Sequence, residues 1–120
     1  MADGKGGEAV SDDVRALARL ARVRGTRIER FSPERPTHWA PYEVTNPATG
    51  EPFTIDGAWE FVADAIDAGA AIEKIVLDKP PGKTGYVMLL AGRGAAQIYI
   101  KLQLGSGVVI GRSFHLSTGK

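Results

Sequence analysis

The chain contains no cysteine, and its 120 residues include only two histidines, His38 and His115. The lack of cysteine excludes disulfides, thiol catalysis and cysteine-ligated zinc, and it is compatible with the cytoplasmic location that we expect. Two histidines without a dense carboxylate cluster predict no metal site, no carboxylate-pair hydrolase and no cofactor.

Long apolar runs are missing as well. No run approaches the roughly 20 residues that span a bilayer, and the first eight residues have no apolar segment like that of a signal peptide. We therefore expect no membrane partner. A net charge of +1 gives no sign of a nucleic-acid binder at the level of the whole chain, so any charge that matters for function must be local.

What is present indicates one soluble globular domain. Hydrophobic residues make up 43% of the chain and charged residues 24%, which is typical of that class. We expect a disordered lead-in over residues 1–10 and a single domain over residues 11–118. Residues 31–56 hold five of the seven prolines and predict a long irregular loop, in which Trp39 anchors the loop on the core and His38 is a surface residue.

Two helices and four strands are predicted from the spacing of apolar residues. Ser11 as N-cap and Gly25 as stop bound the first helix, whereas Thr54 or Asp56 opens the second and Gly69 ends it. Alternating or apolar runs predict strands over residues 71–78, 86–91, 97–104 and 108–116. The order predicts an α+β fold with two helices packed on one face of a four-stranded, mainly antiparallel sheet.

The strand over residues 97–104 separates two kinds of side chain. Isoleucine and leucine occupy its even positions, and these face the core. Such a strand leaves its other face open to solvent. The side chains on that open face are Gln97, Tyr99, Lys101 and Gln103.

The register of the last hairpin decides which side chains join this face. A two-residue loop would set Lys101 beside Arg112, two cations, so we expect a three-residue loop over residues 105–107. Gly111 then leaves room above Lys101, and Arg112 lies on the other face unless the strand twists or bulges. The cluster predicted on the open face is Tyr99, Lys101, Ser113 and His115.

This set of groups suits cleavage of RNA without a metal. A base takes the proton of the 2′-hydroxyl, cations hold the phosphate as its charge grows, and an acid protonates the leaving 5′ oxygen. Imidazole exchanges protons near neutrality, phenol donates a hydrogen bond, and lysine and arginine supply positive charge. The alternative is that these side chains only meet water on an exposed sheet face.

Two other motifs do not carry a function. The run Pro80-Pro-Gly-Lys-Thr84 lacks the earlier glycine and the following helix of a phosphate-binding loop, although Lys83 offers charge beside an RNA or a partner protein. A Ser-His-Asp triad drawn from Ser113 and His115 lacks a nucleophile elbow and an orienting acid.

The first predicted helix carries a strip of arginines opposite its apolar stripe. One interpretation is a solvated face, and another is a strip that follows a phosphate backbone or meets an acidic protein. The second interpretation supports an alternative function, a non-catalytic module that docks a protein or nucleic acid through the basic helix and the polar sheet face. A third hypothesis is an inhibitor that blocks a replication or translation factor by docking. The arginines of the strip are Arg15, Arg19, Arg22 and Arg24.

The C-terminal half, roughly residues 57–116, resembles the motility quorum-sensing regulator (MqsR) toxins, part of the RelE-like group of small bacterial ribonuclease toxins. In that family a Tyr-x-Lys strand precedes a strand ending Ser-Phe-Lys. Tyr99 and Lys101 match the first motif, and Ser113 and Phe114 match the second, with His115 in place of the last lysine. A further family lysine corresponds by spacing to Lys74, and the position nearest to an active-site glutamine of the family is Tyr86.

The resemblance implies a RelE-like fold and a metal-independent endoribonuclease that cleaves mRNA and is neutralised by a cognate antitoxin; whether cleavage takes place on the ribosome stays open. We expect His115 to act as general acid or base, Lys101 and Lys74 to stabilise the phosphorane-like charge, and Tyr99 to position the phosphate. The predicted substrate-binding residues are Arg112, Ser113, Gln97, Gln103, Tyr86 and Lys83.

Overall fold

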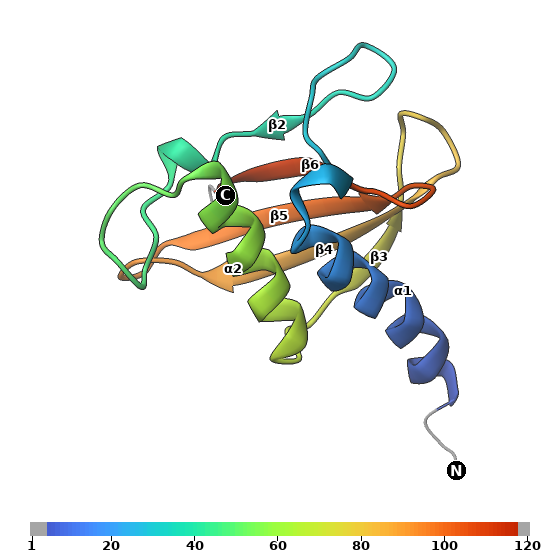
Figure 1. Cartoon of the computed structure of the whole chain (residues 1–120), viewed down its shortest axis with the longest axis horizontal. Coiled ribbons are helices and arrows are strands. Elements are labelled where there is room, and N and C mark those ends of the chain that lie inside the picture. The colour runs from blue at the N-terminus through green and yellow to red at the C-terminus, as the bar shows by residue number, and fades with distance from the viewer. Residues whose placement is uncertain (1–4, 118–120) are drawn as a thin grey trace.

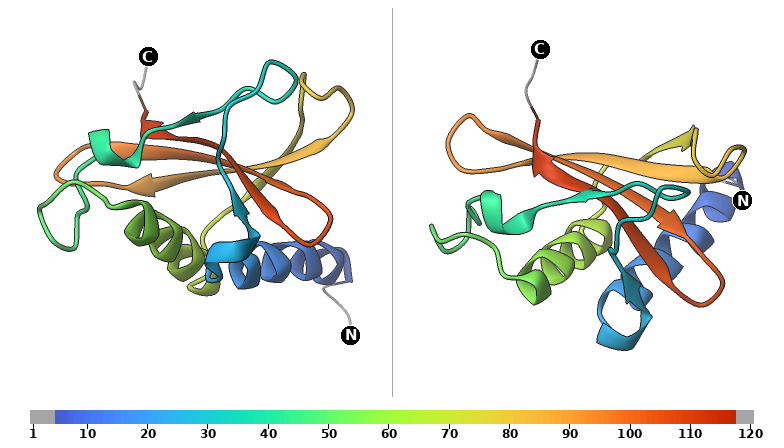
Figure 2. Two further views of the ribbon diagram at one scale, coloured as in Figure 1. Left: turned by 45° about the horizontal axis from the view of Figure 1, so that its top comes forward. Right: turned by 90° about the horizontal axis from the view of Figure 1, so that it is seen from above.

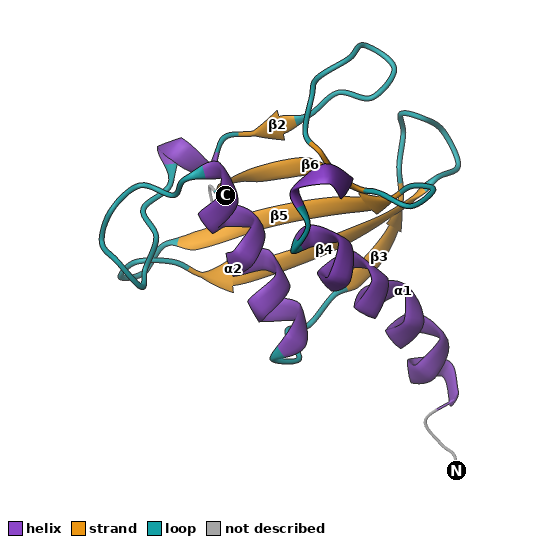
Figure 3. Ribbon diagram, viewed as in Figure 1, coloured by secondary structure: helices purple, strands orange, loops and turns teal. Residues whose placement is uncertain are grey.

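The computed structural model describes residues 5–117, with side chains described from Asp12 onward. Two α-helices, α1 (Lys5–Ala21) and α2 (Ile55–Asp67), lie on the same face of one sheet, as the turned views of Figure 2 show. This confirms the α+β class. Figure 3 shows the long connections that join these elements.

The sheet is mixed and contains six strands in the described residues, not the four antiparallel strands that the sequence predicts. Its order is β1-β6-β5-β4-β3, and β2 also pairs with β6 (Figure 1). β1 and β2 run parallel to β6, and the other pairs are antiparallel. The strands are β1 (Arg27–Ile28), β2 (His38–Trp39), β3 (Glu73–Val76), β4 (Thr84–Ala91), β5 (Gln97–Leu104) and β6 (Val109–Leu116).

The two additional strands come from segments that the sequence assigns to loops. β1 and β2 are two residues long each, so neither offers an alternation that could be recognised. β2 lies within the predicted loop over residues 31–56, which also contains the 3₁₀ helix η2 (Pro41–Glu43). A second 3₁₀ turn, η1 (Arg24–Thr26), leads from α1 into β1.

The boundaries of α2 agree with the predicted caps, whereas the start of α1 does not. Thr54 caps α2, because its hydroxyl accepts a hydrogen bond from the Gly57 amide at 2.8 Å, and Gly69 ends the helical segment with a φ of 87°. α1 begins at Lys5, ahead of the predicted cap at Ser11. The expected lead-in therefore overlaps this helix over residues 5–10, and residues 1–4 lie outside the described residues.

The core lies between the helices and the sheet. Trp59 of α2 and Phe114 of β6 are fully buried there, and Leu17 of α1 packs in the same cluster. On its rim, the Arg22 guanidinium of α1 bonds to the carboxylates of Glu60 (2.7 Å) and Asp64 (3.0 Å) on α2. These pairs are exposed, so burial of the apolar faces supplies most of the helix–helix stability.

Trp39 fastens the long loop to this core, as predicted. Its ring stacks on Trp59 with centroids 4.5 Å apart and meets Phe114 edge-on at 5.3 Å. The space for it exists because residue 111 is glycine: a Cβ there would lie 2.6 Å from the Trp39 ring. Gly111 thus faces the helices and makes room for Trp39, not for Lys101 as the sequence suggested.

We expect Gly111→Ala to lower the free energy of unfolding by about 1–3 kcal/mol, because overpacking forces the indole out of its position. Urea denaturation measures the change. Gly25→Ala is the matched control, since a Cβ at Gly25 meets nothing within 4 Å and its φ is not positive. Equal stability of the two variants would show that Trp39 does not need the space.

Candidate functional site

The candidate site lies on the sheet face opposite the helices. β5 and β6 pair Tyr99 with His115 and Lys101 with Ser113, so these four side chains share that face. The predicted cluster is therefore present, but its register is not the predicted one. The three-residue loop predicts Tyr99 opposite Ser113 and Lys101 opposite Gly111, which differs from the observed pairs.

The turn and a β-bulge together explain the difference. The Gly105 amide donates to the Val108 carbonyl at 2.9 Å, so only Ser106 and Gly107 turn the chain, and Gly107 has a φ of 72°. The predicted three-residue loop is thus wrong. Farther along the hairpin, the pairing shifts by one residue between Lys101 and Leu102, which restores the separation of apolar and polar faces.

Arg112 is the extra residue of the bulge. Lys101 pairs with Ser113 and Leu102 pairs with Gly111, which leaves Arg112 without a partner in the ladder. Its side chain reaches the open face, where Nη1 donates to Gln103 Oε1 at 2.8 Å. The bulge thereby adds a cation to the face that carries Lys101, without setting the two residues directly opposite each other.

Three aromatic rings form a row beside this cation pair. The His115 ring stacks on Tyr99 with centroids 5.3 Å apart, and on its other side it stacks on His38 at 4.3 Å. His38 reaches the row because β2 runs parallel to β6 and pairs His38 with Ser113. His115 Nδ1 lies 3.0 Å from the carbonyl oxygen of Leu116.

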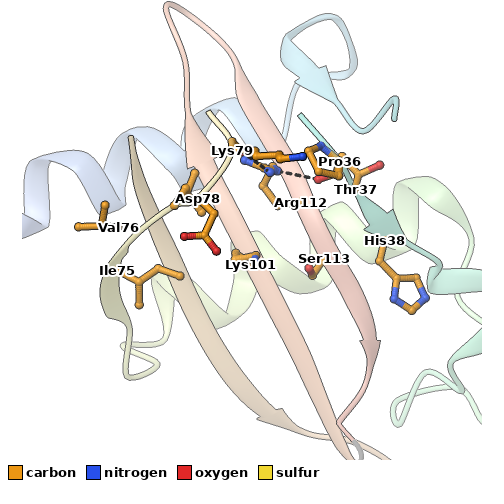
Figure 4. A pocket seen from close by; sticks show the side chains of 11 residues that line it. Pro36, Thr37, His38, Ile75, Val76, Asp78, Lys79, Lys101, Arg112 and Ser113 are labelled. Carbon is orange, nitrogen blue, oxygen red and sulfur yellow. Dashed lines mark hydrogen bonds between the residues drawn. The ribbon is translucent and has the colours of Figure 1, made fainter. Parts of the chain in front are cut away.

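A pocket of about 550 Å³ opens next to the rings. Lys101, Arg112 and Ser113 of the sheet line it, together with residues 36–38 on one side and residues 75–79 on the other. In Figure 4 the Asp78 carboxylate and the His38 ring lie on opposite sides of Lys101 and Ser113. The pocket therefore combines three cationic residues, an imidazole, two hydroxyls and one carboxylate; these are Lys79, Lys101, Arg112, His38, Thr37, Ser113 and Asp78.

The Arg112 guanidinium holds the two walls of this pocket together. Nε donates to the Pro36 carbonyl at 3.0 Å and Nη2 to the Lys79 carbonyl at 2.6 Å. Arg112 is only 4% exposed, and in the described part of the chain no carboxylate forms an ion pair with it. Burial, and then the nearby Arg35, lower the pKa of Arg112. A buried cation that is compensated only by neutral oxygens favours an anion in the adjoining pocket.

Tyr99 stays protonated over a wide pH range. Burial, and then the Glu73 carboxylate, raise the pKa of this phenol, because both disfavour the phenolate. Glu73 lies on the same face because it pairs with Val87, which in turn pairs with Lys101. The Tyr99 hydroxyl therefore remains a hydrogen-bond donor at neutral and moderately alkaline pH.

Two predicted site residues lie on the other face of the sheet. Lys74 pairs with Tyr86, which pairs with the buried Leu102, so both Lys74 and Tyr86 face the helix side. The Tyr86 hydroxyl donates to Asp13 at 2.9 Å, and burial together with this bond raises the pKa of Tyr86 to about 12. Spacing along the chain matched these residues to the toxin motifs, but spacing does not determine the face on which a residue lies.

The remaining predicted residues lie at the margins of the site. Gln103 is buried and engaged by Arg112, whereas Gln97 is exposed at the far end of β5. Lys83 is exposed in the turn before β4 and does not line the pocket. The sequence predicts His38 only as a surface residue, because β2 is two residues long and shows no alternation. It gives no prediction for Asp78, because that residue lies in an irregular turn without a periodic pattern.

Acidic residues engage much of the arginine strip. Arg22 binds the acidic side chains of α2, while Arg24 and Arg27 both bind Asp56, at 2.6 and 2.7 Å. Carboxylates of the same chain thus neutralise part of the positive charge of the strip. This makes it less suited to binding a phosphate backbone.

No family model, curated protein or solved structure matched this chain. Among residues 5–117, no helix has the length and apolarity needed to cross a membrane. Over the same residues, no three His, Cys, Asp or Glu side chains gather closely enough to hold a metal ion.

Arg112→Lys tests whether the guanidinium joins the pocket walls. Three separate nitrogens of the planar guanidinium bond to Pro36, Gln103 and Lys79, and the compact ammonium of lysine lacks this span, so we expect the free energy of unfolding to fall by about 2 kcal/mol. Urea denaturation measures this loss, with Arg19→Lys on the exposed surface of α1 as the control. An Arg112→Lys variant as stable as the control would mean that these bonds do not hold the walls.

Proposed function

We propose that this protein is a metal-independent endoribonuclease of the small toxin type. One observation carries the proposal: His115 stacks on Tyr99 beside a pocket that contains Lys101 and Arg112, on the sheet face opposite α1 and α2 (Figure 2). An imidazole, a protonated phenol and two cations on one sheet face are the groups that RNA cleavage by acid–base chemistry requires.

The charges of the pocket suit a phosphodiester. Lys101 supplies a point charge, and Arg112 adds a buried cation that lacks a carboxylate partner among the described residues. The phosphate gains negative charge on its non-bridging oxygens as the 2′ oxygen attacks, so fixed cations stabilise the transition state more than the ground state. Tyr99, held protonated, donates a hydrogen bond to the same oxygens.

The open face also suits a single strand. His38 ends the row of stacked rings and is exposed, so its outer ring face offers a flat surface for an unpaired base, next to positive charge for the backbone. A double helix would present its bases already paired and stacked. We therefore assign single-stranded RNA as the substrate class.

The biological role follows from the resemblance to the MqsR toxins. Tyr99, Lys101 and Ser113 are motif positions of that resemblance, and in this fold they converge on one face beside the pocket. mRNA in the cytoplasm is the proposed substrate, and a cognate antitoxin is the proposed partner. A RelE-like fold belongs to the same proposal. Lys74 is no longer assigned a catalytic role, because it lies on the helix side of the sheet.

The test uses the purified chain and a single-stranded RNA oligonucleotide in the presence of EDTA. We expect His115→Ala and Lys101→Ala each to lower kcat/KM by at least about 100-fold, since each removes a proton-transfer group or a transition-state charge. Lys74→Ala is the matched lysine control and should retain the activity. Expression in a bacterial host should arrest growth only where cleavage persists.

Several outcomes would contradict the proposal. If the wild-type chain binds the oligonucleotide without cleaving it, the non-catalytic docking module is correct instead. Growth arrest with intact RNA would indicate an inhibitor that acts by docking. If Lys74→Ala loses as much activity as Lys101→Ala, the catalytic face is not the one described.

A further inference from the structure

We infer that His38 is the second imidazole of a proton-transfer pair, with His115 as the base and His38 as the acid. This inference rests on the proposed ribonuclease function and deepens it. The chain contains only two histidines, and the fold brings them face to face with ring centroids 4.3 Å apart and planes inclined by 22°. They lie 77 residues apart in the sequence (115 − 38).

His38 occupies a position that the fold fixes on both sides. Its neighbour Trp39 packs on Trp59 and Phe114, and the amide of Ala40 donates to the Phe114 carbonyl at 3.0 Å. On the other side, the carbonyl of Pro36 accepts a hydrogen bond from Arg112. β2 therefore presents His38 as part of the sheet, and the ring itself remains exposed for a substrate.

The roles follow from the surroundings of each ring. A carbonyl oxygen only accepts hydrogen bonds, so the contact with Leu116 O at 3.0 Å keeps the proton on His115 Nδ1. In the neutral ring, Nε2 then carries the lone pair and takes a proton. His38 lines the pocket that holds Lys101 and Arg112, where the phosphate and its leaving group would lie.

The chemical step is a transesterification that balances without a co-reactant. His115 Nε2 takes the proton of the 2′-hydroxyl while the 2′ oxygen forms a bond to phosphorus. The bond from phosphorus to the 5′ oxygen breaks, and His38 gives its proton to that oxygen. The products are a 2′,3′-cyclic phosphate and a 5′-hydroxyl, and the pair exchanges protons with water before the next turnover.

The spacing of the rings suits this division of work. In an in-line displacement, one group serves the attacking oxygen and another the leaving oxygen, on opposite sides of phosphorus. Two-metal enzymes meet the same demand with ions about 4 Å apart. The centroids of the two imidazoles lie 4.3 Å apart, a similar spacing, and the inference assigns one ring to each of these oxygens.

Charged and titratable groups share the sheet face or the pocket with the pair, and they stay unchanged in the variants of this test. They come from β3, β5, the β6 bulge and the segment before β4. These groups are Glu73, Tyr99, Lys101, Arg112, Asp78 and Lys79.

The experiment compares two substrates that differ in the leaving group. One is an RNA dinucleotide, whose 5′ oxygen needs a proton to leave, and the other is uridine 3′-(4-nitrophenyl phosphate), whose phenolate leaves without one. His38→Phe keeps a stacked ring but has no proton to give. We expect it to lower kcat/KM on the dinucleotide by about 100-fold and to change it little on the aryl ester.

His115→Ala should be slow on both substrates, because both need the base, and Lys74→Ala should match the wild type on both. For the wild type, kcat/KM should follow a bell-shaped pH profile, and His38→Phe should lose the alkaline limb, where the acid deprotonates. Circular dichroism confirms that each variant is folded.

Each failure points to a different part of the account. If the wild-type chain cleaves RNA and His38→Phe cleaves it equally fast, the inference is wrong and the ribonuclease function stands. If His38→Phe loses equal activity on both substrates, His38 only positions His115 and is not the acid. If the wild-type chain cleaves neither substrate, the proposed function itself fails.

Discussion

The guanidinium of Arg112 is the contact on which the candidate site depends. It joins three parts of the chain: the carbonyl of Pro36 before β2, the carbonyl of Lys79 in the turn before β4, and the Gln103 side chain of β5. It can do so because Arg112 is the extra residue of a β-bulge and reaches the open face of the sheet. These bonds connect the two pocket walls, residues 36–38 and residues 75–79, through one side chain.

The same contact links stability to function. Burying an arginine without a carboxylate partner is costly, and three neutral oxygens offset that cost only in part. An anion in the pocket would complete the compensation, so the arrangement favours a phosphate group at that position. The bond to Pro36 also ties down the segment before β2, and the pairing of β2 with β6 keeps His38 beside His115. One side chain thus organises both the charge and the rings of the site.

The sequence predicts the regular part of the molecule well. The cap at Thr54, the strand over Gln97–Leu104 and the separation of its two faces all appear as expected. These features depend on local hydrogen bonding and on the alternation of a strand eight residues long, both of which leave a pattern in the sequence. The open face with Tyr99, Lys101 and His115 was predicted for the same reason.

The irregular part was not predicted, for identifiable physical reasons. The side chain of the bulge residue Arg112 bonds to the carbonyl oxygens of Pro36 and Lys79. Both residues are remote from the hairpin in sequence, so the pattern of the hairpin alone does not predict the bulge. β2 is too short to show any period, so His38 looked like a surface residue of a loop. Lys74 and Tyr86 were chosen by spacing alone, and their pairing with each other and with Leu102 sets them on the helix side.

The central claim is that the sheet face opposite α1 and α2, organised around Arg112, binds a phosphodiester. The most direct measurement is an NMR titration of the backbone amides with a short single-stranded oligodeoxynucleotide, which lacks the 2′-hydroxyl and cannot be cleaved by this chemistry. The account predicts shift changes in β5, β6 and the segments 36–38 and 75–79, which together line the pocket. Changes concentrated on α1 and α2, with the pocket unaffected, would contradict it.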